Sequence, residues 1–186
     1  LHAGGRMTGD FRYNTNWIAI TGAPSSGKTS VINELQKRGY ATQVEVAREL
    51  LESAMARGLT IDEIRRNNQD LQRNIIQLKI AREMALDPEA LIFLDRGTPD
   101  SITYYRNADM DTTEAEAASR LFRYKHVFIF DRLPIKKDGV RTEDEEQANR
   151  IDRWLEEDYK RIGYSPIRVP VMPIDERVNF VLKTAT

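Results

Sequence analysis

The stretch Gly22-Ala-Pro-Ser-Ser-Gly27-Lys28-Thr29 decides the fold of this 186-residue chain. It has the spacing G-x-x-x-x-G-K-T, in which inward-pointing backbone amides can surround phosphate oxygens. The lysine can neutralise the β and γ phosphates of a nucleoside triphosphate, and the threonine hydroxyl can bind Mg²⁺. We therefore expect a triphosphate site here. Its predicted residues are Gly22, Ala23, Pro24, Ser25, Ser26, Gly27, Lys28, Thr29 and Ser30.

The flanking sequence supplies the strand and the helix that this motif requires. Residues 17–21 form a compact run rich in β-branched side chains, which predicts a strand. Residues 28–38 predict a helix, and Gly39 follows as its expected C-terminal cap. A glycine-bearing turn that opens a helix is the context in which such a loop binds phosphate.

The remainder of the chain alternates short apolar runs with long amphipathic segments. Residues 90–94 are continuously apolar, as expected for a parallel strand covered on both faces. Further strands are predicted at 41–46, 126–130 and 167–171, and further helices at 47–57, 60–86, 99–106, 113–124, 142–162 and 174–183. This alternation predicts one α/β domain with a five-stranded parallel sheet.

The amino-terminal segment differs in character from the predicted domain. Leu1 to Arg6 read LHAGGR before Met7, so we expect a tag remnant, natural initiation at Met7 and a loose tail through Asn16. The predicted domain is then residues 17–186.

Composition excludes several classes of function. The 28 Lys and Arg residues nearly balance the 29 Asp and Glu residues, which argues against a nucleic-acid partner. The lack of cysteine excludes disulfides and thiolate metal sites, and it makes a cytoplasmic location the expectation. Apolar runs are far shorter than the roughly 20 residues that span a bilayer, so we expect no membrane span.

The predicted strand at 90–94 ends in Asp95-Arg96-Gly97 rather than in the Asp-Glu of many ATP-hydrolysing machines. Asp95 can hold Mg²⁺ through water or accept a proton from an acceptor hydroxyl, and Arg96 can bind an anionic or sugar group. A helix-capping aspartate and a surface arginine are the alternatives. Asn-Lys-x-Asp and Asp-x-x-Gly motifs are missing at the expected places, which disfavours a GTPase switch.

A kinase must exclude water from its transition state, commonly with a cationic flap. Lys136, Lys137 and Arg141 lie between the strand at 126–130 and the helix at 142–162, where such a lid would fall, at about residues 132–145. Arg141, and with less support Arg150, can stabilise charge on the transferring group. The alternative is that these cations are only solvated.

The acceptor pocket is expected across the strand ends from the phosphate loop. Glu45 and Arg48 leave the strand at 41–46 on one turn, and Glu45 can accept a hydroxyl proton or hold a ribose. A first-turn glutamate favoured by the helix dipole is the alternative. Tyr104 is a further substrate-binding candidate. Further candidates of equal weight are Asn67, Asp70, Arg73, Gln77 and Tyr105, although each of these residues, Tyr104 included, could instead be a surface or core residue. His126 is expected to be structural.

Four segments carry a family resemblance: GAPSSGKTSVINELQKRGY, VEVARELL, FLDRGTPDSITYY and FIFDRLPIKKDGVRTED. Together they resemble the predicted-ATPase, AAA-domain branch of the P-loop NTPases, which includes the nicotinamide riboside kinase domain of bacterial NAD-biosynthesis regulators. The similarity spans about residues 17–182.

This resemblance implies a thymidylate-kinase-like fold with sheet order 2-3-1-4-5, in which ATP or GTP binds with Mg²⁺. It also implies phosphoryl transfer to a small nucleoside-like or nucleotide-like acceptor. By position, Glu45 and Arg48 match a Glu-x-x-Arg element, Asp95 matches the acidic end of strand three, and residues 138–141 match an Asp-Gly-hydrophobic-Arg lid signature. Arg96-Gly97 departs from the riboside kinases and is closer to the thymidylate kinases.

The sequence therefore predicts a Mg²⁺-dependent small-molecule kinase that uses ATP or GTP. The predicted catalytic residues are Lys28, Asp95, Arg141 and Glu45, the substrate residues Glu45, Arg48, Arg96 and Tyr104, and the metal residues Thr29 and Asp95. The main alternative is a nucleotide-binding regulator that controls a partner and has little or no kinase activity. A polynucleotide 5′-hydroxyl kinase is a weaker alternative.

Overall fold

Five parallel strands form the centre of the computed structural model, which describes residues 10–134 and 143–186. The strands of this sheet are β2 (Ile18–Thr21), β3 (Ala41–Gln43), β4 (Ile92–Asp95), β6 (His126–Phe130) and β7 (Ile167–Val169). Their spatial order is β3-β4-β2-β6-β7. The predicted α/β class, the five-stranded parallel sheet and the order 2-3-1-4-5 are confirmed.

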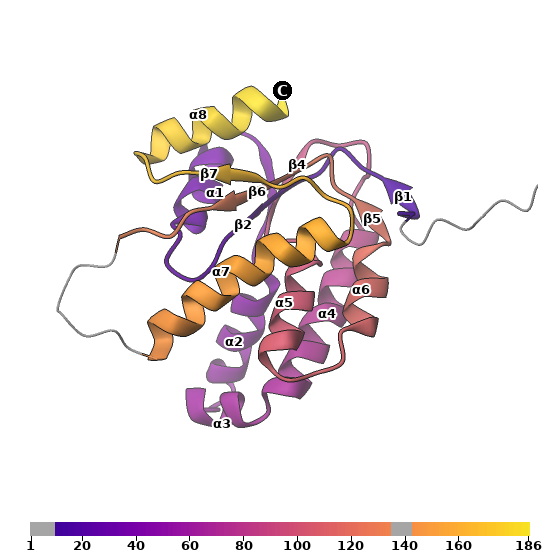
Figure 1. Cartoon of the computed structure of the whole chain (residues 1–186), viewed down its shortest axis with the longest axis vertical. Coiled ribbons are helices and arrows are strands. Elements are labelled where there is room, and N and C mark those ends of the chain that lie inside the picture. Colours follow the sequence, from indigo (N-terminus) through magenta and orange to yellow (C-terminus); the bar gives the residue numbers. More distant parts are fainter. Residues whose placement is uncertain (1–9, 135–142) are drawn as a thin grey trace, which may run out of the picture.

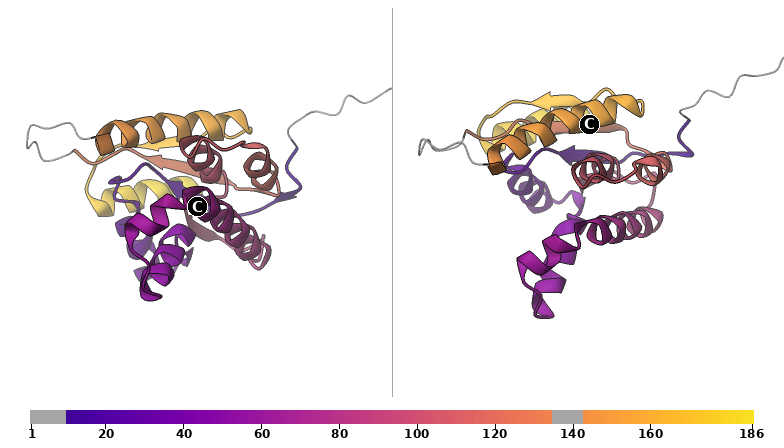
Figure 2. Two further views of the ribbon diagram at one scale, coloured as in Figure 1. Left: turned by 90° about the horizontal axis from the view of Figure 1, so that it is seen from below. Right: turned by 60° about the horizontal axis from the view of Figure 1, so that its bottom comes forward.

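Helices cover both faces of this sheet, giving three layers (Figure 1). They are α1 (Lys28–Lys37), α2 (Val46–Ala56), α3 (Ile61–Arg66), α4 (Asn68–Met84), α5 (Asp100–Asn107), α6 (Thr113–Ser119), α7 (Glu143–Arg161) and α8 (Ile174–Ala185). Helices α1 and α8 pack on one face, and α4 to α7 pack on the other. Figure 2 shows α2 and α3 extending away from the sheet.

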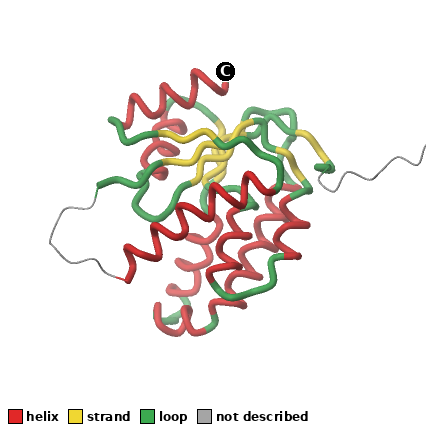
Figure 3. The backbone as a smooth tube through the Cα atoms, in the orientation of Figure 1, coloured by secondary structure: helices red, strands yellow, loops and turns green. Residues whose placement is uncertain are grey.

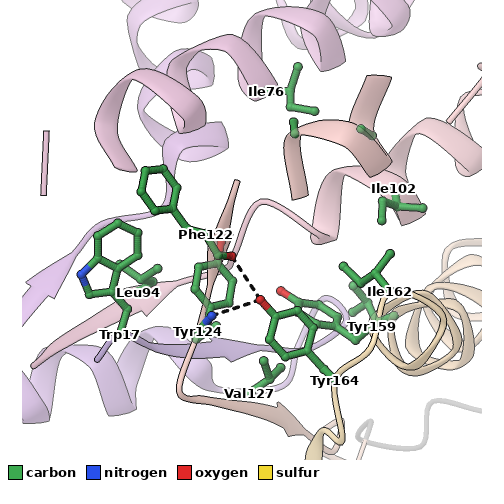
Figure 4. Packing of buried hydrophobic residues seen from close by; sticks show 14 of the residues in the cluster. Trp17, Ile76, Leu94, Ile102, Phe122, Tyr124, Val127, Tyr159, Ile162 and Tyr164 are labelled. Carbon is green, nitrogen blue, oxygen red and sulfur yellow. Dashed lines mark hydrogen bonds between the residues drawn. The ribbon is translucent and has the colours of Figure 1, made fainter. Parts of the chain in front are cut away.

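The two faces of the sheet follow from the alternation of side chains along each strand. In β2, Ile18 and Ile20 pack toward α1 and α8. The intervening Ala19, together with Trp17, packs into the larger core under α4 to α7. Figure 4 shows the aromatic part of this core, where the Tyr164 hydroxyl donates to the Phe122 carbonyl and accepts from the Tyr124 amide.

Three predicted elements differ from the structure. The expected helix 60–86 is two helices, α3 and α4, because Asn67 (φ −104°, ψ 36°) interrupts the helical backbone. The expected helix 113–124 ends at Ser119, since Phe122 and Arg123 form strand β5 (Phe122–Arg123). The expected strand 41–46 ends at Gln43.

The expected loose tail through Asn16 also differs from the structure. Residues Tyr13–Asn14 form strand β1, which pairs in parallel with β5 as a separate two-stranded sheet. The rings of Tyr13 and Phe122 stack with centroids 5.6 Å apart, which accounts for the order of this segment. Across the part of the chain that the structure describes, no helix is long and apolar enough to cross a bilayer.

Candidate functional site

The phosphate loop, residues 22–29, joins β2 to α1 at the carboxyl edge of the sheet, where strands end and helices begin (Figure 3). Ser25 (φ 66°) and Gly27 (φ 76°) adopt left-handed backbone conformations that curl the loop. A Cβ at Gly22 would lie 2.6 Å from Ser26 Oγ and 2.9 Å from the Phe130 carbonyl oxygen, so this position admits glycine alone.

The loop keeps backbone donors available for an anion. Helix α1 begins at Gly27 without a side-chain cap, and its dipole favours negative charge at that end. Within the described residues, the amides of Ser25, Ser26 and Gly27 donate no hydrogen bond. Ser26 Oγ is also buried without a partner there. Unpaired donors at a helix N-terminus fit the oxygens of a polyphosphate.

Sheet register brings the predicted catalytic groups to this loop. Ile20 of β2 lies opposite Asp95 of β4, which places the Asp95 carboxylate beside the start of the phosphate loop. Gln43 of β3 lies opposite Leu94, so Glu45 follows at the same edge. The carboxyl ends of three adjacent parallel strands thus converge, as ligand sites in open α/β sheets require.

Lys28 is held between two carboxylates. Its Nζ donates to Asp95 Oδ1 at 2.7 Å and to Glu45 Oε2 at 2.9 Å, and its side chain is 7% exposed. An ammonium group has three protons, so at most one remains for another acceptor. Binding of a triphosphate at Lys28 would therefore compete with these two ion pairs.

The two carboxylates differ in basicity. Burial raises the pKa of Asp95, and the neighbouring Lys28 opposes this rise only in part. Burial also raises the pKa of Glu45, but the charges of Arg96 and Lys28 outweigh burial and lower it to about 2. Asp95 is thus the better proton acceptor at neutral pH.

Arg96 is fixed from two sides. Its backbone is left-handed (φ 66°), its Nε donates to Glu45 Oε1 at 3.0 Å, and its Nη1 donates to Asp100 Oδ2 at 2.8 Å. Asp100 also accepts from Thr21 Oγ1 at 2.6 Å and from the Tyr159 hydroxyl at 2.7 Å. This buried network orients Glu45 and holds Arg96 in the wall of the site.

A cavity of about 540 Å³ joins the phosphate loop to the predicted acceptor residues. Its wall includes residues 23–30 of the loop together with Glu45, Arg48, Arg96 and Tyr104. These predicted residues therefore share one hollow, whereas Gly22 and Asp95 do not line it, and Asp95 lines a separate small hollow. The remaining wall is formed by Ala47, Leu51, Leu71, Gln72, Ile75, Lys79 and Ser101.

The five acceptor candidates weighed equally with Tyr104 lie outside this cavity. Tyr105 is buried, and its hydroxyl donates to Glu114, which also accepts from Gln77. Asn67, Asp70 and Arg73 line separate surface hollows. One residue along a helix is a rotation of about 100°, so the face with Gln72 and Lys79 reaches the cavity while the face with Arg73 does not.

Sequence reasoning missed Gln72, Lys79 and Ser101, although the helical spacing of the first two from Leu71 and Ile75 was a usable signal. Of the predicted cations, Lys136, Lys137 and Arg141 lie outside the described residues. Arg150 donates to Asn107 Oδ1 at 3.2 Å and does not line the cavity. His126 begins β6 beside Phe128, where burial lowers its pKa.

Arg177 of α8, which no motif indicated, supports the phosphate loop from behind. Its guanidinium donates to the carbonyls of Ser26, Asp131 (3.0 Å) and Pro170 (3.1 Å), and it lies 4.8 Å from the Phe130 ring centroid. The Leu133 amide adds a contact by donating to the Ser25 carbonyl at 2.8 Å. Every residue has a backbone carbonyl, so contacts of this kind cannot be recognised in the sequence.

The residues present fit Mg²⁺ bound with a nucleotide better than Mg²⁺ bound alone. No group of three or more His, Cys, Asp or Glu side chains is placed for a metal in the described ranges. Mg²⁺ commonly uses only one or two protein ligands together with phosphates and water. Thr29, in the cavity wall next to Lys28, could supply such a ligand, with Asp95 behind it.

Several solved structures have a fold similar to that of this chain. Deoxyadenosine kinase from M. mycoides, with dCMP and dCDP bound, has a TM-score of 0.61 and 19% identity over 90% of this chain and 97% of its own. Thymidylate kinase from Ehrlichia chaffeensis has a TM-score of 0.65 and 14% identity over 90% and 96%, respectively.

NadR protein, in complex with NAD and AMP-PNP, has a TM-score of 0.65 and 16% identity over 92% of this chain, which spans 49% of the NadR chain. No curated protein matches by sequence. At these identities the similarity establishes the fold. A family model described as an AAA domain matches residues 17–177. This chain therefore belongs to the AAA-domain family.

Proposed function

We propose that this protein is a Mg²⁺-dependent kinase that transfers the γ phosphoryl group of ATP or GTP to a small nucleoside-like or nucleotide-like acceptor. The observation that carries the proposal is the single cavity of about 540 Å³, whose wall contains both the phosphate loop and the side chains of Glu45, Arg48, Arg96 and Tyr104. A donor and an acceptor bound in one hollow would meet in the geometry that phosphoryl transfer needs.

Each group of residues has a separate role in the proposed reaction. Loop amides and Lys28 bind the phosphates. Thr29, assisted by Asp95, would hold Mg²⁺, which would neutralise phosphate charge. In the alternative role, Asp95 accepts the proton of the acceptor hydroxyl instead of assisting Mg²⁺, and its raised pKa suits that task better than the lowered pKa of Glu45. Glu45, Arg48, Arg96 and Tyr104 position the acceptor.

The residue after Asp95 favours transfer over hydrolysis. It is Arg96, which is bound to Glu45 and Asp100, instead of a glutamate that could polarise water. Arg141 remains our candidate for stabilising charge on the transferring group from the lid. The names of the solved structures, deoxyadenosine kinase and thymidylate kinase, are consistent with such chemistry.

Incubation with γ-labelled ATP or GTP, Mg²⁺ and a panel of nucleosides, nucleoside monophosphates and ribosides tests the proposal. We expect label on at least one acceptor, and labelling about a hundredfold to a thousandfold slower with the Lys28→Ala variant. Release of inorganic phosphate with no labelled acceptor would reject the kinase assignment and favour the nucleotide-binding regulator.

A further inference from the structure

Lys79 is a buried amine in the wall of the cavity. It projects from α4, is 7% exposed, and lines the hollow beside Ser101 and Tyr104. In residues 10–134 and 143–186, no carboxylate oxygen lies within 4.0 Å of its Nζ. The other buried cations of the cavity wall, Lys28 and Arg96, each contact two carboxylates.

The contacts of Lys79 within the protein are few and weak. Its Nζ donates to the Gly97 carbonyl oxygen at 3.1 Å and to Ser101 Oγ at 3.4 Å. Both acceptors are uncharged, the second distance is near the limit of a hydrogen bond, and an ammonium has a third proton. Burial lowers the pKa of Lys79, and the negative charges of Asp100, Glu83 and Glu45 oppose this only in part.

A buried amine without a counter-ion is costly, whereas methionine or leucine would pack at the same place at no electrostatic cost. A buried amine of this kind is expected where a bound ligand supplies the missing hydrogen-bond acceptor or counter-ion. The residues around Lys79 indicate which kind of ligand fits there. Leu71 and Ile75 line the same cavity and suit a flat apolar ring. What the amine adds to that wall is a hydrogen-bond donor.

We propose that Lys79 donates a hydrogen bond to a ring carbonyl oxygen of the phosphoryl acceptor, so that the enzyme selects keto-bearing over amino-bearing rings. The proposal rests on the proposed kinase function and names the substrate class of that site. Lys79 then acts as a specificity-determining residue, separate from the groups around Lys28.

Matched acceptors test it: inosine against adenosine, uridine against cytidine, and the corresponding 5′-monophosphates. Within each pair one exocyclic group is keto in the first member and amino in the second, and the adjacent ring nitrogen carries a proton only in the keto member; the C2 carbonyl is common to uridine and cytidine. We expect wild-type kcat/KM to favour the keto member at least about tenfold in one or more pairs, since a site built for one hydrogen bond rejects its mismatch. Lys79→Met should remove that preference by slowing the keto member alone.

Two further variants separate recognition from structure. Lys79→Gln retains an N–H donor and should retain part of the preference. Arg73→Met, which removes an exposed cation from the same helix outside the cavity, should leave the preference unchanged. Thermal melting of each variant reports whether the fold is intact.

Ligand-induced melting shifts distinguish failure of this inference from failure of the kinase proposal. If no acceptor is phosphorylated but keto ligands stabilise the wild type and not Lys79→Met, the inference stands and the kinase proposal fails. A lack of keto preference in both readouts overturns the inference. An equal loss with every acceptor in Lys79→Met also overturns it, because that result would reflect only support of the Gly97 turn.

Discussion

Lys28 Nζ lies 2.7 Å from Asp95 Oδ1, so the lysine of the phosphate loop is ion-paired to the carboxylate at the end of the adjacent strand. Both side chains are almost fully buried, and Glu45 completes the contact from the other side at 2.9 Å. The lysine charge therefore links the phosphate-binding and acceptor-binding parts of the cavity. Removing any one of the three groups should affect both parts.

Replacing Lys28 by Ala should lower kcat/KM for phosphoryl transfer by about a hundredfold to a thousandfold, because a preorganised cation at the transferring phosphate is lost. It should also destabilise the fold, since two buried carboxylates lose their partner. Steady-state kinetics and denaturant unfolding measure the two effects. Lys37→Ala, at the exposed end of the same helix, is the control and should change neither.

Asp95→Asn should reduce kcat by about a hundredfold to ten-thousandfold, the range for loss of a positioned general base. Glu45→Gln should act mainly through KM for the acceptor, because the pKa of Glu45 is lowered to about 2 and its carboxylate is a weak base. Steady-state kinetics at saturating ATP, with the acceptor concentration varied, separate the effect on kcat from the effect on KM. A larger kcat loss in Glu45→Gln would transfer the role of base to Glu45.

Gly97→Ala should destabilise the protein by about 1–3 kcal/mol through overpacking. The added Cβ would lie 2.5 Å from Tyr124 Cε2 and 2.7 Å from the Tyr159 hydroxyl oxygen, within the aromatic core of Figure 4. Urea unfolding measures the change. An unaltered unfolding midpoint would show that the turn after Arg96 has room for a side chain.

Arg177→Met should weaken ATP binding about tenfold, equivalent to about 1.4 kcal/mol, because Ser26 and its neighbours lose the donor that fixes their carbonyls. Arg177→Lys should be intermediate, since a lysine cannot reach three carbonyls with a planar fork. Calorimetric titration with ATP measures both affinities. Wild-type affinity in Arg177→Met would mean that the phosphate loop holds its shape without this support.

Glu83 should make stability depend on pH. Burial raises its pKa from 4.5 to about 7, although the hydrogen bond from the Tyr124 hydroxyl and the charge of Lys79 act in the opposite direction. The folded state therefore holds this proton more tightly than the unfolded state. Its stabilising contribution is complete below pH 4.5 and is lost as pH rises through about 7.

A rise from 4.5 to about 7 corresponds to about 3 kcal/mol. The unfolding free energy of the wild type should fall by about this amount relative to Glu83→Gln between those two pH values. Urea unfolding of both proteins across that range measures it. Parallel pH profiles of the two would contradict the assignment.

The fold was predictable from local signals because each central strand is apolar and the loop at 22–29 fixes a strand, a turn and a helix in succession. The break at Asn67 was not predicted, because the apolar residues Ile64, Leu71 and Ile75 on its two sides fit one continuous helix, although Asn67 and Asn68 are poor helix formers. Strands β1 and β5 have two residues each, too few for any periodicity to appear.

The site was predictable where a motif fixes position. Residues 23–30, Glu45, Arg48, Arg96 and Tyr104 line one cavity, whereas Gly22 and Asp95 do not, and the roles assigned to all of them stay predictions. Lys79 and Arg177 were not predicted. Lys79 donates to a turn carbonyl and a hydroxyl, and Arg177 donates to loop carbonyls. These groups become neighbours only in the folded chain. Arg73 was a candidate and Lys79 was not, because the spacing of Lys79 from Leu71 and Ile75 places these residues on one face of the helix but does not show that this face meets the cavity.

The central claim is that residues 22–29 bind the phosphates of a nucleoside triphosphate through Lys28. Isothermal titration of the protein with Mg-ATP and Mg-GTP tests it most directly. We predict heat consistent with one site for at least one nucleotide, and loss of that heat in Lys28→Ala but not in Lys37→Ala. Absence of heat and of any thermal stabilisation with both nucleotides would contradict the claim.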